Sequence, residues 1–572
     1  MEYFTANVES QTLELAILDT LSSFSNIPFI YHFENTMAAD KRDLFMPGDA
    51  LRDSFYKTLL EFPLLAGHLC MGTEGRGSVV VDRNNLNLPE YCESTYDVHF
   101  DELKAANYHW GLFPKDLVSV CVVTTAGADG VIKLANIHCA RLRDNSGMLL
   151  FANMSHYVVD GIGFCAFISR WAEHCRQACC DGVKPVVEHR VFHFDRNIVH
   201  KALSLDRRPT SAAASDLFFV PRFAASALAW ISPALRGRIM SVVASMGKPE
   251  AHMFHISKER LEALRCSLSD YVPSDIRLSD NDLIASLASM TIVNGIKSAA
   301  ISSCNGGILS RLMSVCSSIF GDLFAKTENE HLTFVIADIR HRLGICDSGY
   351  TGNCVIPQLV VNSLQRMESP ITPESHAHVA SRVRAAVQDF GRPYISQFVD
   401  TLNRFPSSFA QPLVYTINHP EKVFITNQSR FPLYDLNFGF GTPVWVSPIP
   451  HKRVLSSKHL TINTYEDALD ARKEFNTAYQ QAALAWWQCR QRLLSAGSVN
   501  AMMRSISRSI RAKQSSTSPS NIQHKGKRAI HVVREHFGIV LNHNASPISI
   551  ADEEYTDATY ERVRLTRSRL MQ

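Results

Sequence analysis

His156 and Asp160 are the residues of this sequence whose types and spacing could carry out acid–base chemistry. With Gly161 they form His-x-x-x-Asp-Gly, at a point where an extended apolar run turns into a helical pattern. A histidine near its ordinary pKa can take a proton from a hydroxyl or an amine, and a nearby carboxylate can hold the loop or the imidazole. We expect Gly161 to allow a backbone conformation that other residues resist. On spacing alone a structural histidine is the commoner outcome, because a chain with 23 histidines contains such spacings by chance.

The elements around this pattern predict an α/β fold. In the first half, apolar spacing predicts helices at Leu51–Leu60 and Phe164–Arg176, strands at Ser78–Asp82 and Leu117–Thr124, and a hairpin across Val131–Phe151 with its turn at Arg143–Gly147. The second strand of this hairpin runs into His156. A strand end followed by a helix is thus expected to position the candidate base.

A second α/β unit is predicted to begin near His255. Ser279 is a candidate N-cap for a helix over Leu283–Met290, and further patterns predict strands at Leu332–Asp338 and Val423–Thr426 and helices at Ala377–Phe390 and Ala468–Leu494. The predicted organisation is a first domain at 1–200, a linker at 201–254, a second domain at 255–497 and a basic tail at 498–572 that is rich in Ser, Arg and Lys and is expected to be disordered.

Composition excludes several classes of function. The 58 basic and 55 acidic residues leave a net charge of +3, which is too small a field to indicate nucleic acid or an anionic membrane as a partner. The 14 cysteines are irregularly spaced, which is typical of reduced thiols, and no secretory signal or membrane-spanning segment is recognised. We therefore expect a cytoplasmic protein without a transmembrane segment.

Five segments, in the right order, resemble those of the BAHD acyltransferases. The first and second are similar to the family's Tyr-Pro-x-Leu-Ala-Gly and His-x-x-x-Asp-Gly segments, and the third to the helix that opens its second domain. The fourth resembles its paired Asp-x-Arg-x-Arg and Tyr-x-Gly-Asn patterns, and the fifth its Asp-Phe-Gly-Trp-Gly-x-Pro signature. They are Glu61–Leu69, Ser155–Gly163, Ser279–Ala285, Ala337–Pro357 and Arg430–Pro443.

The resemblance implies a fold, an activity and roles for residues. The fold would be two chloramphenicol-acetyltransferase-like domains with the active-site channel between them. The chain would be a monomer that binds no resident cofactor and uses acyl-CoA as a co-substrate to acylate a small-molecule alcohol or amine of specialised metabolism. His156 would be the general base in a ternary complex. Asp160 would form a salt bridge that shapes the loop, with Arg277 or Arg340 as its partner.

The last segment departs from the family's pattern at two positions. In the signature Asn437-Phe438-Gly439-Phe440-Gly441, which in the family supports the CoA side, Asn437 replaces Asp and Phe440 replaces Trp. The first replacement removes a charge that could pair and the second removes an indole donor, while both largely retain shape. Upstream, Gln428 stands where plant members often have a tryptophan that donates to the oxyanion, and its amide could donate as well.

Alternative interpretations remain open. A condensation-type acyl or peptidyl transferase shares the fold but normally has a second histidine at the position of Ser155. A catalytically inactive binding protein on the same fold is conceivable because of Asn437 and Phe440. Cys175 and Cys179 could form half of a metal site, but no second pair completes it, so no metal is predicted.

Overall fold

The computed structural model describes residues 2–21, 26–71, 77–109, 112–113, 131–179, 190–204, 256–302, 330–367, 371–404, 423–448 and 458–462. Residues Met1–Met502 form one compact unit, and all described residues belong to it. The predicted strand at Leu117–Thr124, the helix at Ala468–Leu494, most of the 201–254 linker and the 498–572 tail lie outside the described residues.

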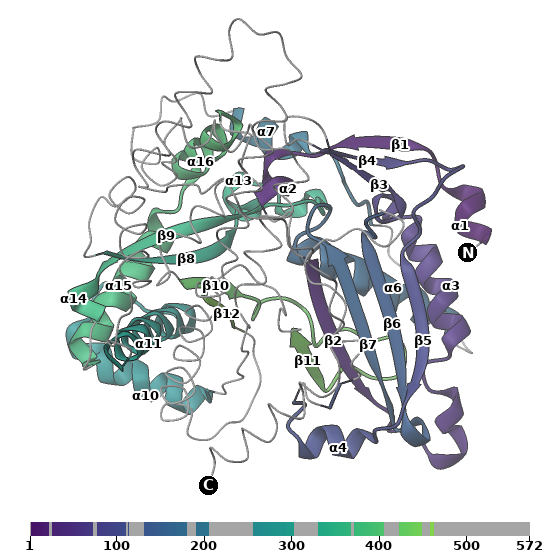
Figure 1. Ribbon diagram of the computed structural model, residues 1–572, viewed down its shortest axis with the longest axis horizontal. Coiled ribbons are helices and arrows are strands. Elements are labelled where there is room, and N and C mark those ends of the chain that lie inside the picture. Colours follow the sequence, from purple (N-terminus) through teal and green to yellow (C-terminus); the bar gives the residue numbers. More distant parts are fainter. Residues whose placement is uncertain are drawn as a thin grey trace, which may run out of the picture. The chain divides into compact units, whose positions relative to one another are not determined.

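A five-stranded mixed sheet forms the centre of the first half (Figure 1). Its order is β11-β2-β7-β6-β5, with β5 parallel to β6 and the other neighbours antiparallel. The strands are β2 (Asn26–Glu34), β5 (Glu90–Tyr96), β6 (Ala135–Leu142), β7 (Gly147–Ser155) and β11 (Trp445–Pro448). The β6–β7 hairpin confirms the predicted one, and its turn places Asp144 and Asn145 at positive φ.

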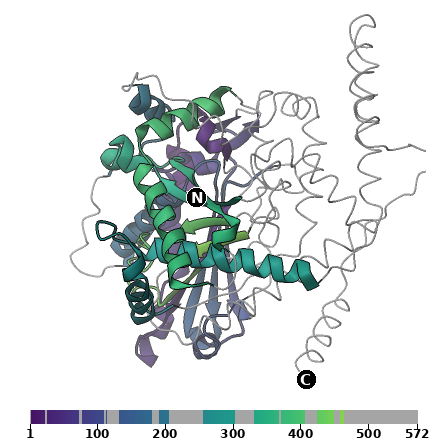
Figure 2. The same ribbon diagram turned by 90° about the vertical axis from the view of Figure 1, so that its left-hand side faces the viewer.

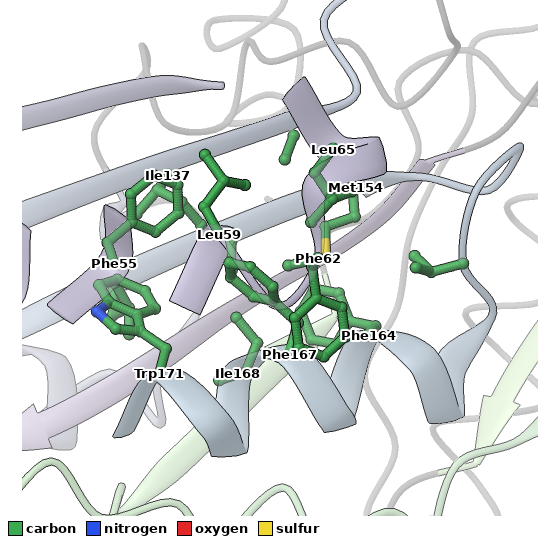
Figure 3. Close-up of a cluster of buried hydrophobic side chains, with 14 of the residues drawn as sticks. Phe55, Leu59, Phe62, Leu65, Ile137, Met154, Phe164, Phe167, Ile168 and Trp171 are labelled. Atoms are coloured by element: carbon green, nitrogen blue, oxygen red, sulfur yellow. The ribbon is translucent and has the colours of Figure 1, made fainter. Parts of the chain in front are cut away.

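Every residue of β7 is buried, because both faces of the sheet are covered. On one face, α3 (Gly48–Leu59) and α6 (Gly161–Cys179) pack against each other and against the sheet. They confirm the helices predicted at Leu51–Leu60 and Phe164–Arg176. Figure 3 shows that Phe164, Phe167, Ile168 and Trp171 of α6 face Phe55 and Leu59 of α3 and Phe62, which follows α3. The indole of Trp171 donates to the Leu51 carbonyl over 2.9 Å. This interlocked aromatic layer fixes the helix that follows the His156 loop.

A four-stranded sheet forms the centre of the second half, in the order β12-β10-β8-β9. Its strands are β8 (Glu330–Asp338), β9 (Val355–Ser363), β10 (Val423–Asn427) and β12 (Lys458–Ile462). The helices α10 (Lys258–Leu268), α11 (Asp280–Ser302) and α15 (Pro373–Asp389) accompany it, with α11 seen along its axis in Figure 1 and lengthwise in Figure 2. Ser279 and Asp282 bond to each other's backbone amides at the start of α11, and this cap agrees with the predicted one.

The remaining elements connect and flank these two layers. A small sheet has the order β1-β4-β3 and contains β1 (Gln11–Glu14), β3 (His68–Met71) and β4 (Gly77–Val81). The other helices are α1 (Glu2–Asn7), α2 (Ile17–Leu21), α4 (Phe100–Ala105), α7 (Asn197–Ser204), α13 (Arg340–Leu343), α14 (Leu364–Met367) and α16 (Arg392–Arg404). The 3-10 turns are η1 (Ala39–Leu44), η2 (Pro63–Ala66), η4 (Arg143–Asn145), η6 (Ser269–Tyr271) and η7 (Cys346–Ser348).

The chain crosses from the second half back to the first after β10. β11 joins the five-stranded sheet as its edge strand beside β2, and Leu433, Leu436 and Phe438 are buried in the core of the first half. The predicted boundaries place these residues in a second domain, yet their apolar side chains complete the first core. A linear division of the sequence could not show this return, because it depends on pairing between strands more than 400 residues apart.

Candidate active site

The loop His156–Asp160 joins the buried strand β7 to the helix α6. It turns tightly, since the amide of Val158 donates to the Ser155 carbonyl over 3.1 Å. Asp160 then caps α6, because its Oδ1 accepts from the amides of Ile162 and Gly163, both over 3.1 Å. Contacts within the first half of the chain therefore fix the conformation of this loop at both of its ends.

Arg340 is the arginine that pairs with Asp160. Its Nη1 lies 2.8 Å from Asp160 Oδ2 and its Nη2 lies 3.1 Å from Oδ1, and both side chains are buried. The amide of Cys354 also donates to Oδ2, over 3.0 Å. Arg277, the other arginine considered, is exposed. The bidentate pair joins the His156 loop to α13.

Asn353 contacts the candidate base directly. Its Oδ1 lies 2.8 Å from Nδ1 of His156, and its Nδ2 donates to the His156 carbonyl over 2.7 Å. Nδ2 also donates to Oδ1 of Asp19 over 2.8 Å. Asn353 is buried and follows the turn before β9, so the second half of the chain holds the imidazole of the first half.

These contacts determine which nitrogen of His156 carries the proton. A carbonyl and a carboxylate only accept hydrogen bonds, so both must face the NH₂ group of Asn353. The amide oxygen then faces Nδ1, which must donate. In the neutral imidazole the other nitrogen, Nε2, keeps its lone pair. The geometry leaves Nε2 as the atom that can accept a proton from a bound molecule.

The pKa of His156 is lowered from its ordinary value of 6.5. Burial is the largest cause, because the ring is surrounded by protein on most sides, although it remains partly exposed. The carboxylates of Asp160 and Asp19 and the bond to Asn353 oppose this shift. The neutral, proton-accepting form therefore prevails at neutral pH.

Gly161 serves a purpose different from the predicted one. Its φ is not positive, so the expectation of an unusual backbone conformation is wrong; Gly161 is simply the first residue of α6. A Cβ atom there would lie 2.3 Å from Cζ of Phe431, so the ring of Phe431 occupies the space that a side chain would need. Close packing against this ring, and not conformational freedom, favours glycine at this position.

Gln428 lies in the turn that follows β10. Its Oε1 is buried and forms no hydrogen bond, and within the described part of the chain no bond joins its side chain to His156. The structure therefore leaves its predicted role as an oxyanion donor as a prediction.

The signature segment Asn437–Gly441 packs on the first half. Phe438 is fully buried with its ring edge-on to Trp171 at 5.0 Å, and Phe440 lies edge-on to Phe45 at 5.8 Å. Asn437 Oδ1 accepts from the amide of Gly439 over 2.7 Å, and its carbonyl accepts from Arg176. Gly439 and Gly441 have φ of 106° and 101°, which favour glycine.

Asp19 and Arg196 are site residues that the sequence patterns did not reveal. Asp19 contacts Asn353, and Arg196 forms an ion pair with Asp19. Asn353 belongs to the quoted Tyr-x-Gly-Asn segment, so that pattern was a signal for it. Nothing local marks Asp19 or Arg196, because their partners lie far away in the sequence.

The cysteines of α6 do not form part of a metal site within the described residues. Sγ of Cys175 and Sγ of Cys179 lie 4.0 Å apart, and the pKa of Cys175 is raised by its contact with Cys179 and by burial. Among the described residues no group of three or more His, Cys, Asp or Glu side chains could hold a metal ion.

Comparisons with known proteins agree with this arrangement. The sequence profile described as the Transferase family matches residues 5–210 and 243–467. No curated protein matches the sequence. TRI101 of F. sporotrichioides, solved with coenzyme A and T-2, is 13% identical with a TM-score of 0.54, covering 84% of this chain and 99% of that chain. TRI101 of F. graminearum, solved with coenzyme A and deoxynivalenol, is 12% identical with a TM-score of 0.53, covering 78% and 91%.

At such identities these two solved structures establish the fold, and the profile establishes the family. No helix in the described residues is long and apolar enough to cross a membrane. Because the profile covers most of the chain, and the architecture is the mixed α/β one that the resemblance implied, the chain belongs to the Transferase family of BAHD acyltransferases, which transfer acyl groups from acyl-CoA.

Proposed function

We propose that this chain transfers an acyl group from acyl-CoA to a hydroxyl of a small specialised metabolite, with His156 as the general base. The observation that carries this proposal is the orientation of the Asn353 amide. Because that amide holds the proton on Nδ1, the lone pair of Nε2 is free to act on an acceptor.

The reaction would proceed by direct attack in a ternary complex. As Nε2 takes the hydroxyl proton, the acceptor oxygen forms a bond to the thioester carbonyl carbon. The tetrahedral intermediate collapses with cleavage of the carbon–sulfur bond, and the imidazolium returns its proton to the departing thiolate. An ester and free CoA result, and no acyl-enzyme forms. A donor to the oxyanion would assist this step, and Gln428 is the candidate.

Asp160 supports this chemistry without taking part in it. Its carboxylate is occupied by Arg340, by the cap of α6 and by the Cys354 amide. It therefore holds the loop that carries His156 at a fixed position between the two halves. We assign it a structural role within the catalytic loop.

The class of acceptor is inferred from the neighbours and the composition. TRI101 of F. graminearum was solved in complex with coenzyme A and deoxynivalenol, and in complex with coenzyme A and T-2 mycotoxin, both of which are small molecules. A chain with 31 phenylalanines and a similar fold is suited to an apolar acceptor that bears a hydroxyl group. Acetyl-CoA is the simplest donor to test first, and an amine acceptor is the alternative.

The test is release of free CoA thiol by the purified full chain, supplied with acyl-CoAs and a panel of hydroxylated small molecules. We expect acceptor-dependent release that His156→Ala lowers by about two to four orders of magnitude. His138→Ala is the matched control, since His138 is a partly exposed histidine on β6 that bonds to Ser94 outside the site.

Equal losses in both variants would contradict the general-base role of His156, because they would point to a common effect on folding. Acceptor-dependent release that persists in His156→Ala would contradict it as well. If the wild-type chain bound no acyl-CoA, the proposal of acyl transfer itself would fall, and the inactive binding protein would become the better interpretation.

A further inference from the structure

Asp19 lies behind the contact between Asn353 and His156. It lies in α2 and is fully buried, and its two carboxylate oxygens contact different partners. Oδ1 accepts from Nδ2 of Asn353 over 2.8 Å, while Oδ2 accepts from the amide of Ala16 over 2.8 Å and lies 3.0 Å from Nε of Arg196. A carboxylate in a buried position is costly unless it is paired, so this placement requires the arginine.

Arg196 is clamped between the two halves of the chain. Its side chain is almost fully buried, and Nη2 donates to the Val158 carbonyl inside the catalytic loop over 2.6 Å. Its guanidinium lies over the ring of Tyr350. A Cβ atom on Gly352 would lie 2.1 Å from Nη1, so the glycine beside Asn353 leaves the space that the guanidinium occupies.

These contacts form a chain from Arg196 through Asp19 and Asn353 to His156. The carboxylate of Asp19 can only accept, so the Asn353 NH₂ group must face it. If the acceptor at position 19 were lost, the His156 carbonyl alone would oppose rotation of the amide, and the NH₂ group could turn to Nδ1. Nδ1 would then accept, the proton would move to Nε2, and the atom that acts as the base would be blocked.

We propose that Asp19, held by Arg196, is a positioning residue that keeps the Asn353 amide oriented and so keeps the His156 proton on Nδ1. The inference rests on the proposed function for its catalytic meaning, but the arrangement can be tested without a substrate. Asp19 touches no reacting atom and acts only through Asn353.

Several charged and polar groups face His156 and must be considered together. Asp160 comes from the end of the catalytic loop and is paired with Arg340. Asp19 comes from α2 and is paired with Arg196. Asn353 is the one neutral group of the set that bonds to the ring. Removing Asp19 together with Arg196 takes away a charge of each sign and leaves the pair of Asp160 intact.

The test measures how fast diethyl pyrocarbonate modifies His156 in the full chain, followed by mass spectrometry of the peptide that contains it. An imidazole nitrogen that bears a lone pair attacks a carbonyl carbon of this reagent and is ethoxycarbonylated, so the rate of modification reports whether Nε2 is free. The variant is Asp19→Leu with Arg196→Leu, which removes the acceptor without leaving an unpaired buried arginine. Asp19→Asn, which is nearly the same shape, is the second variant if the double variant does not fold. Its one oxygen is expected to stay with the Ala16 amide and Arg196, so that its NH₂ group replaces the acceptor that faces Asn353.

The matched control is Asp282→Leu with Arg384→Leu, another ion pair with a buried carboxylate, located on α11 and α15 outside the site. In the variant Asp19→Leu with Arg196→Leu we expect modification of His156 to slow by at least about tenfold, because a misplaced proton blocks Nε2. Turnover, where an acceptor has been found, should fall in kcat with little change in KM for acyl-CoA. The control should change neither quantity.

The inference would be overturned if the Asp19→Leu, Arg196→Leu variant folded and its His156 were modified at the wild-type rate, with the same dependence on pH. An equal slowing in the control variant would also overturn it, because the effect would then be one of general loosening. If the wild-type chain showed no acyltransfer activity but His156 were still modified more slowly in the variant, the positioning role of Asp19 would stand while the proposed function failed. The two failures are therefore distinguishable.

Discussion

The loop around His156 and the segment Asn437–Gly441 are both motif regions, but different forces hold them. Directional polar contacts hold the first: the ion pair of Asp160 with Arg340, and the bond from His156 to Asn353. Ring packing holds the second, together with one side-chain turn at Asn437. The two regions therefore differ in how much substitution they can tolerate.

This difference explains where the sequence departs from its family. Hydrogen bonds specify which atom faces which, so a change in the His156 loop would alter the protonation of the base. Aromatic packing requires mainly shape, and Phe440 still reaches Phe45 edge-on without an indole nitrogen. Asn437 keeps the turn to the Gly439 amide, because an amide oxygen accepts as a carboxylate oxygen does. The departures fall in the region that accommodates them.

The largest effect is expected from breaking the buried pair in the first region. Asp160→Ala leaves Arg340 buried and unpaired and removes the cap of α6, so we expect a loss of about 3–5 kcal/mol in the free energy of unfolding. Unfolding by urea, followed by circular dichroism, measures this loss.

The control is Asp97→Ala at the exposed pair with Arg143, where screening by solvent makes the expected loss much smaller. Similar losses in the free energy of unfolding for Asp160→Ala and Asp97→Ala would show that burial does not make the Asp160 pair stronger. The contrast between the polar contacts of the first region and the ring packing of the second would then be unsupported.

Much of the fold could be predicted from the sequence, because its signals are local. The apolar spacing of α6 and the turn residues Arg143–Gly147 act within a few positions, and the helix and hairpin follow. The return of β11 to the first sheet and the contact of Asp19 with Asn353 depend on residues hundreds of positions apart. No local pattern encodes such contacts, so only the structure reveals them.

The second prediction concerns the contact between Gly161, at the end of the first region, and Phe431, which precedes the second region in the sequence. In Gly161→Ala, the new methyl group would collide with the ring of Phe431, so we expect a loss of about 1–3 kcal/mol in stability. Gly391→Ala is the control, since its Cβ would find only ordinary contact at 3.5 Å.

A double variant sharpens this test. Phe431→Leu in the Gly161→Ala background should restore part of the loss, because the smaller side chain vacates the space. The coupling energy is read from the urea midpoints of the four proteins. Additive losses would mean that the two residues do not crowd each other.

The third prediction follows from the lowered pKa of His156. The proton-accepting form is lost as pH falls through this pKa, so kcat/KM should fall about tenfold per pH unit on the acid side. Burial lowers the pKa, so the midpoint of this limb should lie below the ordinary 6.5. Protonation also favours the unfolded state, in which the pKa is ordinary, so the stability contribution of this group is lost below 6.5 as well.

Rates of thiol release from pH 4 to pH 8, with unfolding followed over the same range, separate the two effects. A midpoint above 6.5 would contradict the dominance of burial and would favour the charge of Asp160 or Asp19 as the stronger influence.

The smallest effect is expected from the second region, at Asn437. Asn437→Ala removes the bond to the Gly439 amide and should cost about 1 kcal/mol. Asn437→Asp restores the family's residue and keeps an acceptor at the same place, so its effect should stay within about 0.5 kcal/mol. The adjacent Arg176 would favour the added charge, since its guanidinium already contacts the Asn437 carbonyl. Urea midpoints of both variants measure these differences. If Asn437→Asp proved as costly as Asn437→Ala, the turn would depend on the amide NH₂ group, and this region would be as sensitive to polar detail as the loop of His156.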